Sequence, residues 1–186
     1  MIKNVVNQFS LLLFIIILIS SSCSSSKKYS YSKTKKTRTE RTRATTAKVR
    51  TTKTSVSDKS KRNSIVSTAK KYIGKSYVYG GKTPSAGFDC SGFTAHVFKN
   101  NGIDISGPSH HQARKGKRKS KKSLEKGDLI FFGKNNKVSH VAIVANVSNS
   151  KIEVIHSTSS RGVVVDDIST SNYWNERYLF GRDVLD

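Results

Sequence analysis

The chain has 186 residues, enough for one domain with additional segments, and its 34 Lys and Arg against 12 Asp and Glu give a net charge of +22. Apolar residues make up 35% of the chain, a low share for a protein that is globular throughout. Fifteen of the basic residues fall in the first 63 positions, so a strongly basic N-terminal part precedes a moderately basic domain.

The N-terminus has the pattern of an export signal. Lys3 precedes an unbroken apolar run over residues 11–19, which is too short to span a bilayer core that needs about twenty residues. Ser20-Ser21-Ser22-Cys23 follows and resembles the lipidation site of bacterial lipoproteins, although Ser20 stands where leucine is usual. We expect a signal peptide over 1–22 and a lipidated Cys23, with simple secretion as the alternative.

The resemblance to a lipoprotein implies a membrane attachment through Cys23. Nothing acidic follows Cys23, which by the same resemblance favours the outer membrane, on its periplasmic face, if the source is Gram-negative. With Cys23 used in this way, the only other cysteine has no disulfide partner within the chain.

Residues 24–62 consist of Ser, Thr, Lys and Arg with few large apolar side chains. Such a segment cannot bury enough surface to offset the entropy of ordering it, so we expect residues 23–62 to be a lipidated, disordered basic tether. Its charge either holds the protein near anionic lipid or wall polymer or serves only to solvate a spacer. The sequence lacks a motif of interleaved basic and aromatic residues and carries an export signal, so we expect no specific nucleic-acid partner.

Residues 63–186 read as one α+β domain, in which helices come first and strands follow. Asn63 is expected to cap a helix that ends at Gly74, and residues 76–81 are expected to form a short strand. Residues 114–126 are expected to be an exposed basic loop. A helix is expected from residue 90, and a short helix or turn near 108–112. About five or six antiparallel strands make up the rest, with strands expected at 129–132, 138–146, 151–156, 162–165 and 178–180.

Cys90 lies at the predicted start of a helix whose apolar face carries Phe93, Val97 and Phe98. Unpaired backbone N–H groups and the positive end of the helix dipole stabilise an anion there, which predicts a lowered pKa for the Cys90 thiol. The alternative is an inert, buried cysteine.

The strands at 138–146 and 151–156 should form a hairpin. If Asn146 pairs with Ser150, His140 lies directly opposite His156; a one-residue bulge makes the two histidines diagonal neighbours instead. A thiol and a histidine pair suit acyl transfer, in which one imidazole takes the thiol proton, the second polar group orients the first ring, and the Cys90 N–H serves as an oxyanion donor. The histidines could also be ordinary sheet residues, or form a Cys/His/His zinc site, but no Cys-x-x-Cys pattern accompanies them and we expect neither metal nor cofactor.

Five motifs follow one another along the chain: Ser76-Tyr77-Val78-Tyr79-Gly80-Gly81, Phe88-Asp89-Cys90-Ser91-Gly92-Phe93, Lys126-Gly127-Asp128-Leu129-Ile130-Phe131-Phe132, Ser139-His140-Val141-Ala142-Ile143 and Val154-Ile155-His156-Ser157. Together and in this order they resemble the NlpC family of papain-like cysteine peptidases, which cut the peptide stems of bacterial peptidoglycan. The resemblance covers roughly residues 63–186 and looks most similar to single-domain lipoprotein murein endopeptidases.

The resemblance implies a papain-like fold with Cys90 as nucleophile, His140 as base and His156 as the orienting residue. It further implies that Tyr77 lies near the thiol and that Asp89 and Ser91 bind polar groups of the stem peptide, although Asp89 could simply cap the helix and Tyr77 could simply pack. Residues 106–109 depart from the family pattern. The implied activity is hydrolysis of an amide bond in stem peptides or crosslinks, and the alternative is a catalytically idle wall-binding or scaffolding lipoprotein.

Overall fold

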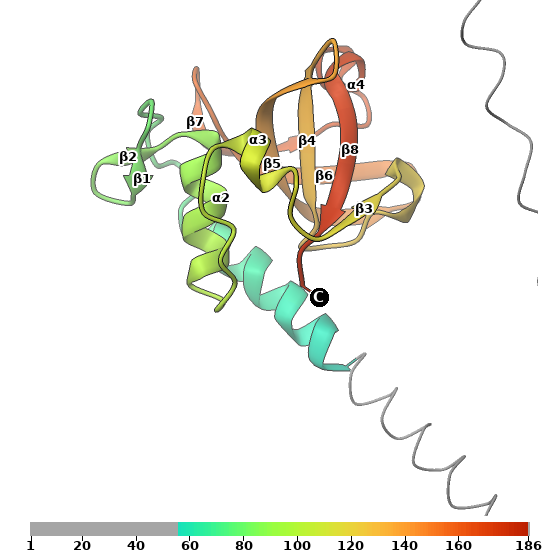
Figure 1. The fold of residues 1–186 in the computed structure, drawn as a ribbon, viewed down its shortest axis with the longest axis horizontal. Helices are drawn as coiled ribbons and strands as arrows, with labels where there is room; N and C mark the ends of the chain where they lie inside the picture. Colours follow the sequence, from blue (N-terminus) through green and yellow to red (C-terminus); the bar gives the residue numbers. More distant parts are fainter. Residues whose placement is uncertain (1–55, 186) are drawn as a thin grey trace, which may run out of the picture. The chain divides into compact units, whose positions relative to one another are not determined.

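The computed structural model describes residues 56–185 (Figure 1). The expected signal peptide, Cys23 and most of the tether lie outside these residues. A helix occupies residues 56–70 and is followed by three named helices, a 3-10 turn and eight strands. These are β1 (Lys82–Thr83), β2 (Gly87–Phe88), α2 (Cys90–Lys99), α3 (Ser109–Gln112), β3 (Lys117–Lys119), η1 (Lys121–Ser123), β4 (Leu129–Lys134), β5 (Lys137–Ser148), β6 (Lys151–Thr158), β7 (Gly162–Asp167), α4 (Asn172–Arg177) and β8 (Tyr178–Asp183). Among the described helices, none combines the length and apolar character that crossing a membrane requires.

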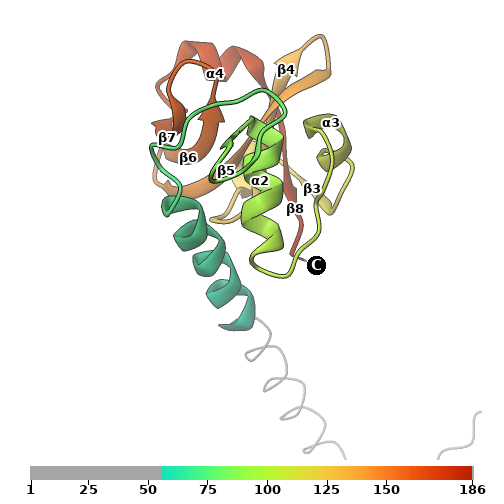
Figure 2. The same ribbon diagram turned by 90° about the vertical axis from the view of Figure 1, so that its left-hand side faces the viewer.

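The centre of the fold is a six-stranded sheet with the order β3-β8-β4-β5-β6-β7, in which every neighbouring pair is antiparallel. This confirms the α+β prediction. Apolar side chains line both faces of the sheet, which explains why Leu129 to Phe132 are all buried. On one face, α2 packs against β5 and β6 (Figure 2), and its Phe93, Val97 and Phe98 are fully buried, as their spacing predicts. On the other face, Trp174 of α4 packs against a cluster of buried apolar side chains: Leu124, Ile130, Phe132, Ala142, Val144, Ile152, Val154 and Ile168.

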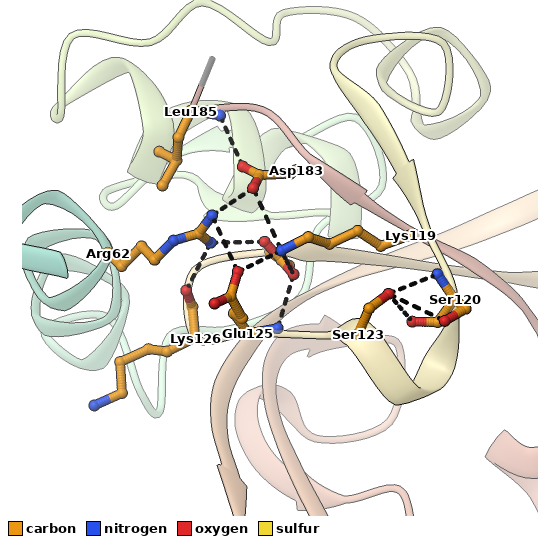
Figure 3. A network of polar contacts seen from close by, with 9 residues as sticks. Arg62, Lys119, Ser120, Ser123, Glu125, Lys126, Asp183 and Leu185 are labelled. Atoms are coloured by element: carbon orange, nitrogen blue, oxygen red, sulfur yellow. Dashed lines mark hydrogen bonds and ion pairs between the residues drawn. The ribbon is translucent and has the colours of Figure 1, made fainter. Parts of the chain in front are cut away.

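The first helix differs from the prediction because it begins well before Asn63, which lies inside it and does not cap it. Ile65 and Ala69 are fully buried in the core, as the helix pattern predicts. Arg62, one turn before Ile65 in this helix, ties the helix to the rest of the domain through a network of ion pairs, part of which is shown in Figure 3. The helix therefore begins within the segment predicted to be tether, and its first buried side chain is Ile65.

The network around Arg62 joins parts of the chain that are far apart in sequence. The Arg62 guanidinium donates to Asp183 (Figure 3). It also donates to Asp128, at 2.7 Å, and Lys119 Nζ lies 3.1 Å from Asp128. Asp128 is fully buried and also accepts a backbone hydrogen bond from Glu125 at 2.8 Å. A buried carboxylate is tolerated because these partners neutralise it.

Two further predictions about local structure are wrong. Residues 76–81 form no strand; only Tyr77 makes an isolated bridge, to Phe88. The predicted loop over 114–126 contains β3, which pairs with β8 at the sheet edge, and it buries Leu124. An edge strand rich in lysine is a common way of discouraging further strand pairing, and the charge run concealed it from a pattern-based prediction.

The β5–β6 hairpin has a shorter turn than predicted. Ser148 pairs with Lys151, and Asn149 adopts a φ of +46°, so the predicted pairing of Asn146 with Ser150 is wrong. A register shift between Val144 and Asn146 then sets Val144 opposite Val154. Continued along the hairpin, this register makes His140 and His156 diagonal neighbours on one face, which is the bulged alternative.

Candidate active site

Cys90 is the first residue of α2, as predicted, and Asp89 caps the helix. One oxygen of the Asp89 carboxylate accepts from the backbone N–H of Gly92, at 2.6 Å, and from the Ser91 hydroxyl, at 2.9 Å. The other oxygen accepts from the backbone N–H of Gly80 at 3.0 Å. Three donors thus fix the start of the helix and the preceding loop around the thiol.

Gly92 is required for this arrangement. A Cβ at this position would lie 2.0 Å from the carbonyl oxygen of Gly81, so only glycine lets the loop approach the helix start. The loop in turn brings Tyr77 near Cys90, because Tyr77 bridges to Phe88, two residues before Cys90.

Cys90 and His140 line the same open cleft, which has a volume of about 850 Å³. The backbone N–H groups of Val141, the residue after His140, and of Ser91 and Cys90 lie near enough to the Cys90 thiol to lower its pKa through hydrogen bonding. Tyr77 also lines the cleft. The structure therefore brings the predicted nucleophile, base and tyrosine together in one solvent-accessible site.

A chain of hydrogen bonds leads from His140 into the protein. His140 Nε2 lies 3.1 Å from Nδ1 of His156, which is fully buried, and His156 Nε2 lies 3.0 Å from Asp166 Oδ2. Arg161 forms a two-point ion pair with the same carboxylate, through Oδ1 at 3.0 Å and Oδ2 at 2.5 Å. We call His140, His156, Asp166 and Arg161 the histidine relay.

The relay determines which nitrogen of His140 keeps a free lone pair. The Arg161 guanidinium holds the pKa of Asp166 below its ordinary value, so this carboxylate is ionised and can only accept. His156 therefore donates from Nε2 to Asp166 and accepts at Nδ1, and His140 donates from Nε2. These tautomers are assigned from the network. They leave Nδ1 of His140 as the free lone pair.

Trp174 covers both histidines. Its ring stacks on that of His140, with centroids 5.1 Å apart and planes 27° apart, and lies 5.0 Å from the His156 ring. Burial lowers the pKa of His140 to about 3, with a contribution from His156, and burial also lowers the pKa of His156. Both imidazoles are therefore neutral at neutral pH.

The predicted lowering of the Cys90 pKa is wrong. Burial raises the pKa of the thiol, and the adjacent Asp89 carboxylate raises it further. The backbone N–H groups of Val141, Ser91 and Cys90 act in the opposite direction but do not outweigh burial. With the thiol pKa raised and the His140 pKa lowered, the resting pair is a neutral thiol and a neutral imidazole.

Asp89 and Ser91 do not line the cleft. The structure shows a capping role for Asp89 and a hydrogen bond from Ser91 that supports the cap; their binding of substrate stays a prediction. Both nitrogens of His156 are occupied within the relay, which leaves no lone pair there for zinc. Within residues 56–185, the side chains close enough to share a metal ion are Glu125, Asp128 and Asp183, and Arg62 and Lys119 already pair with them.

Sequence reasoning missed Asp166, Arg161 and Trp174. Val154 pairs with Asp166, so Asp166 lies diagonally across the β6–β7 hairpin from His156 on the same face. The alternation of residues along these two strands could have suggested this neighbour once the register was known. Trp174, the only tryptophan of the chain, lies after β7 with no motif to connect it to the histidines.

A helix that presents a thiol beside a histidine on an antiparallel sheet defines a papain-like domain with a thiol–imidazole cleft. The chain belongs to the NlpC/P60 family, whose family model matches residues 74–183.

Two curated relatives show the extent of the similarity. Gamma-DL-glutamyl hydrolase of Bacillus subtilis (strain 168) is 33% identical over 120 residues, which cover 64% of this chain and 29% of that protein. Gamma-D-glutamyl-L-lysine dipeptidyl-peptidase of Bacillus cereus is 39% identical over 125 residues, which cover 62% of this chain and 36% of that protein. The chain thus spans about a third of the length of these relatives.

Solved structures of the family are also similar. An NlpC/P60 family protein from Bacillus cereus has 33% identity and a TM-score of 0.60, over 67% of this chain and 40% of that one. The NlpC/P60 domain of the peptidoglycan hydrolase SagA has 35% identity and a TM-score of 0.55, over 66% of this chain and 97% of that domain. These relatives confirm the papain-like fold that the motifs predict.

Proposed function

We propose that the protein is a peptidoglycan endopeptidase that hydrolyses an amide bond in the stem peptides or crosslinks of the bacterial cell wall. The observation that carries the proposal is that Cys90 and His140 line one cleft, with Nδ1 of His140 left free by the histidine relay. Membership of a family whose named relatives are peptidases supports it. Two relatives carry "glutamyl" with a gamma prefix in their names, which favours the γ-glutamyl bond of the stem over the alanyl crosslink.

In the proposed mechanism, His140 Nδ1 takes the thiol proton as the Cys90 sulfur attacks the carbonyl carbon of the scissile amide. The carbonyl oxygen becomes an oxyanion, and backbone N–H groups around the sulfur donate to it. The His140 imidazolium then gives its proton to the leaving nitrogen, the C–N bond breaks, and a thioester remains on Cys90. Water attacks the thioester with His140 as base, which releases a carboxylic acid and restores the thiol.

Each member of the relay has a role in this cycle. His156 Nδ1 accepts a hydrogen bond from the Nε2–H of His140 and so holds the His140 ring with Nδ1 directed to the thiol. Asp166 fixes the tautomer of His156 and stabilises the positive charge that develops on the histidines. Lipidation at Cys23 would hold the domain at the cell envelope, with the tether setting its reach.

The test is digestion of purified sacculi with the full-length protein, followed by mass spectrometry of the released muropeptides. Wild type should release peptides whose masses identify the cut bond, while Cys90→Ala and iodoacetamide-treated wild type should release none. Circular dichroism checks that the variant is folded. Undiminished release by Cys90→Ala would refute the proposal, and binding of sacculi by wild type without any release would support the alternative of an idle wall-binding lipoprotein.

A further inference from the structure

The cleft has an uneven distribution of charge. Four cations line it and no carboxylate does: Lys134, Lys137, Arg161 and Arg177. Lys134 and Lys137 pair with each other across the end of the β4–β5 hairpin, where Asn135 and Asn136 form the turn with φ values of +51° and +59°. The hairpin thus carries two ammonium groups to the mouth of the cleft.

The four cations differ in how far they are already engaged. Arg161 is paired with Asp166, and the Arg177 guanidinium lies 3.7 Å from the centroid of the Tyr173 ring and donates to the Tyr173 carbonyl. Lys134 and Lys137 are exposed and form no ion pair with any of residues 56–185. The two lysines are therefore the cleft charges available to a ligand.

The proposed role of His140 indicates which part of the substrate lies beside these two lysines. As general acid, His140 must reach the nitrogen that leaves, so the leaving segment lies on the histidine side of the cleft. Trp174 stacks on His140, and the same lining includes Tyr173 and the two lysines. Lys137 precedes His140 by three residues on β5 and both line the cleft, so a segment that leaves from His140 lies beside the two lysines.

We propose that Lys134 and Lys137 bind a free carboxylate on the leaving segment of the substrate, one or two residues beyond the scissile amide. The inference rests on the proposed function and adds the chemical class of the segment released. An ammonium on a long, flexible stem acts as a point charge and accepts a carboxylate in several geometries. The absence of acids from the cleft lining means that no side chain there competes for the lysines. A leaving segment whose carboxylates are amidated loses this interaction.

The experiment uses two synthetic stem peptides that are identical except that the leaving segment ends in a carboxylate or in a carboxamide. We expect wild type to cleave the carboxylate peptide with a kcat/KM about three- to tenfold higher, which lies within the range that two exposed ion pairs supply. The Lys134→Gln/Lys137→Gln double variant should cut both peptides equally. Lys151→Gln, an exposed lysine at the β5–β6 turn, is the matched control and should keep the preference.

A second readout does not depend on turnover. The leaving segment alone, as acid or amide, is tested for protection of Cys90 against alkylation by iodoacetamide. The acid should protect at about three- to tenfold lower concentration in wild type, and the two should be equal in the double variant. Equal protection by acid and amide in wild type, or a preference that survives in the double variant, overturns the inference. Failure of both peptides to be cleaved would count against the proposed function instead, and the protection result still decides the inference.

Discussion

Replacing Asp166 with asparagine tests the tautomer assignment on which the base depends. Asp166 lies 3.0 Å from His156 Nε2 and, as a carboxylate, only accepts hydrogen bonds. An amide can instead present its NH2 group, in which case His156 carries its proton on Nδ1 and His140 must accept at Nε2. His140 then carries its proton on Nδ1, the nitrogen that has to receive the thiol proton.

The magnitude follows from the lost charge-assisted hydrogen bond, which contributes about 1.5–3 kcal/mol. At about 1.4 kcal/mol for each tenfold change in rate, kcat/KM of Asp166→Asn should fall about 10- to 150-fold. KM should change little, because Asp166 does not line the cleft. The assay is steady-state cleavage of a stem peptide at pH 7.5, with Asp167→Asn as control, since Asp167 accepts from the Ser169 backbone and takes no part in the relay. Wild-type kcat/KM in Asp166→Asn would refute the assignment.

The remaining predictions concern ionisation and stability. Because burial raises the thiol pKa, alkylation of Cys90 by iodoacetamide should be slow at pH 6 and rise up to and beyond pH 9; a plateau of reactivity from pH 5 to 7 would reveal a thiolate–imidazolium pair instead. The pKa of His140 is about 3 in the folded protein and about 6.5 in the unfolded chain, which therefore binds more protons between these values. Urea unfolding should show stability that is fully present above pH 6.5 and falls towards pH 3, by at most about 1.4 kcal/mol per pH unit from this group, and His140→Asn should flatten the decline. Arg62→Ala leaves the buried carboxylate of Asp128 without its closest cation, so the free energy of unfolding should fall by about 3 kcal/mol. Lys59 is exposed, and Lys59→Ala should change the free energy of unfolding little. Equal effects of the two variants would contradict a structural role for the network.

Features with a local signal could be predicted from the sequence. The spacing of Phe93, Val97 and Phe98 after Cys90 predicts one buried helix face, and the structure confirms it. The apolar strands and the hairpin that carries both histidines were likewise accessible. The residues that form the hairpin turn could not be predicted. A bulge at residue 145 and a shorter loop together still bring the two histidines to one face, so the histidine positions do not reveal where the turn lies.

Features that depend on distant packing could not be predicted. Arg62 is one of many basic residues in its segment, and only the fold brings it to Asp128 and Asp183, which lie 66 and 121 residues further along the chain. The direction of the Cys90 pKa shift depends on how deeply the fold buries the thiol, which the helix start alone does not reveal. The position of Asp166 beside His156 follows from the β6–β7 register. The sequence of the loop between these strands does not determine that register.

The most direct test of the central claim is to trap the acyl intermediate. Wild-type protein mixed with a stem peptide and quenched in acid within one turnover should gain the mass of the acyl portion of the substrate, and peptide mapping should locate it on Cys90. His140→Ala should show a greatly reduced adduct under the same conditions, since the thiol then lacks its base. Cleavage of the peptide by wild type with no adduct on Cys90, or with an adduct on another residue, would contradict the account.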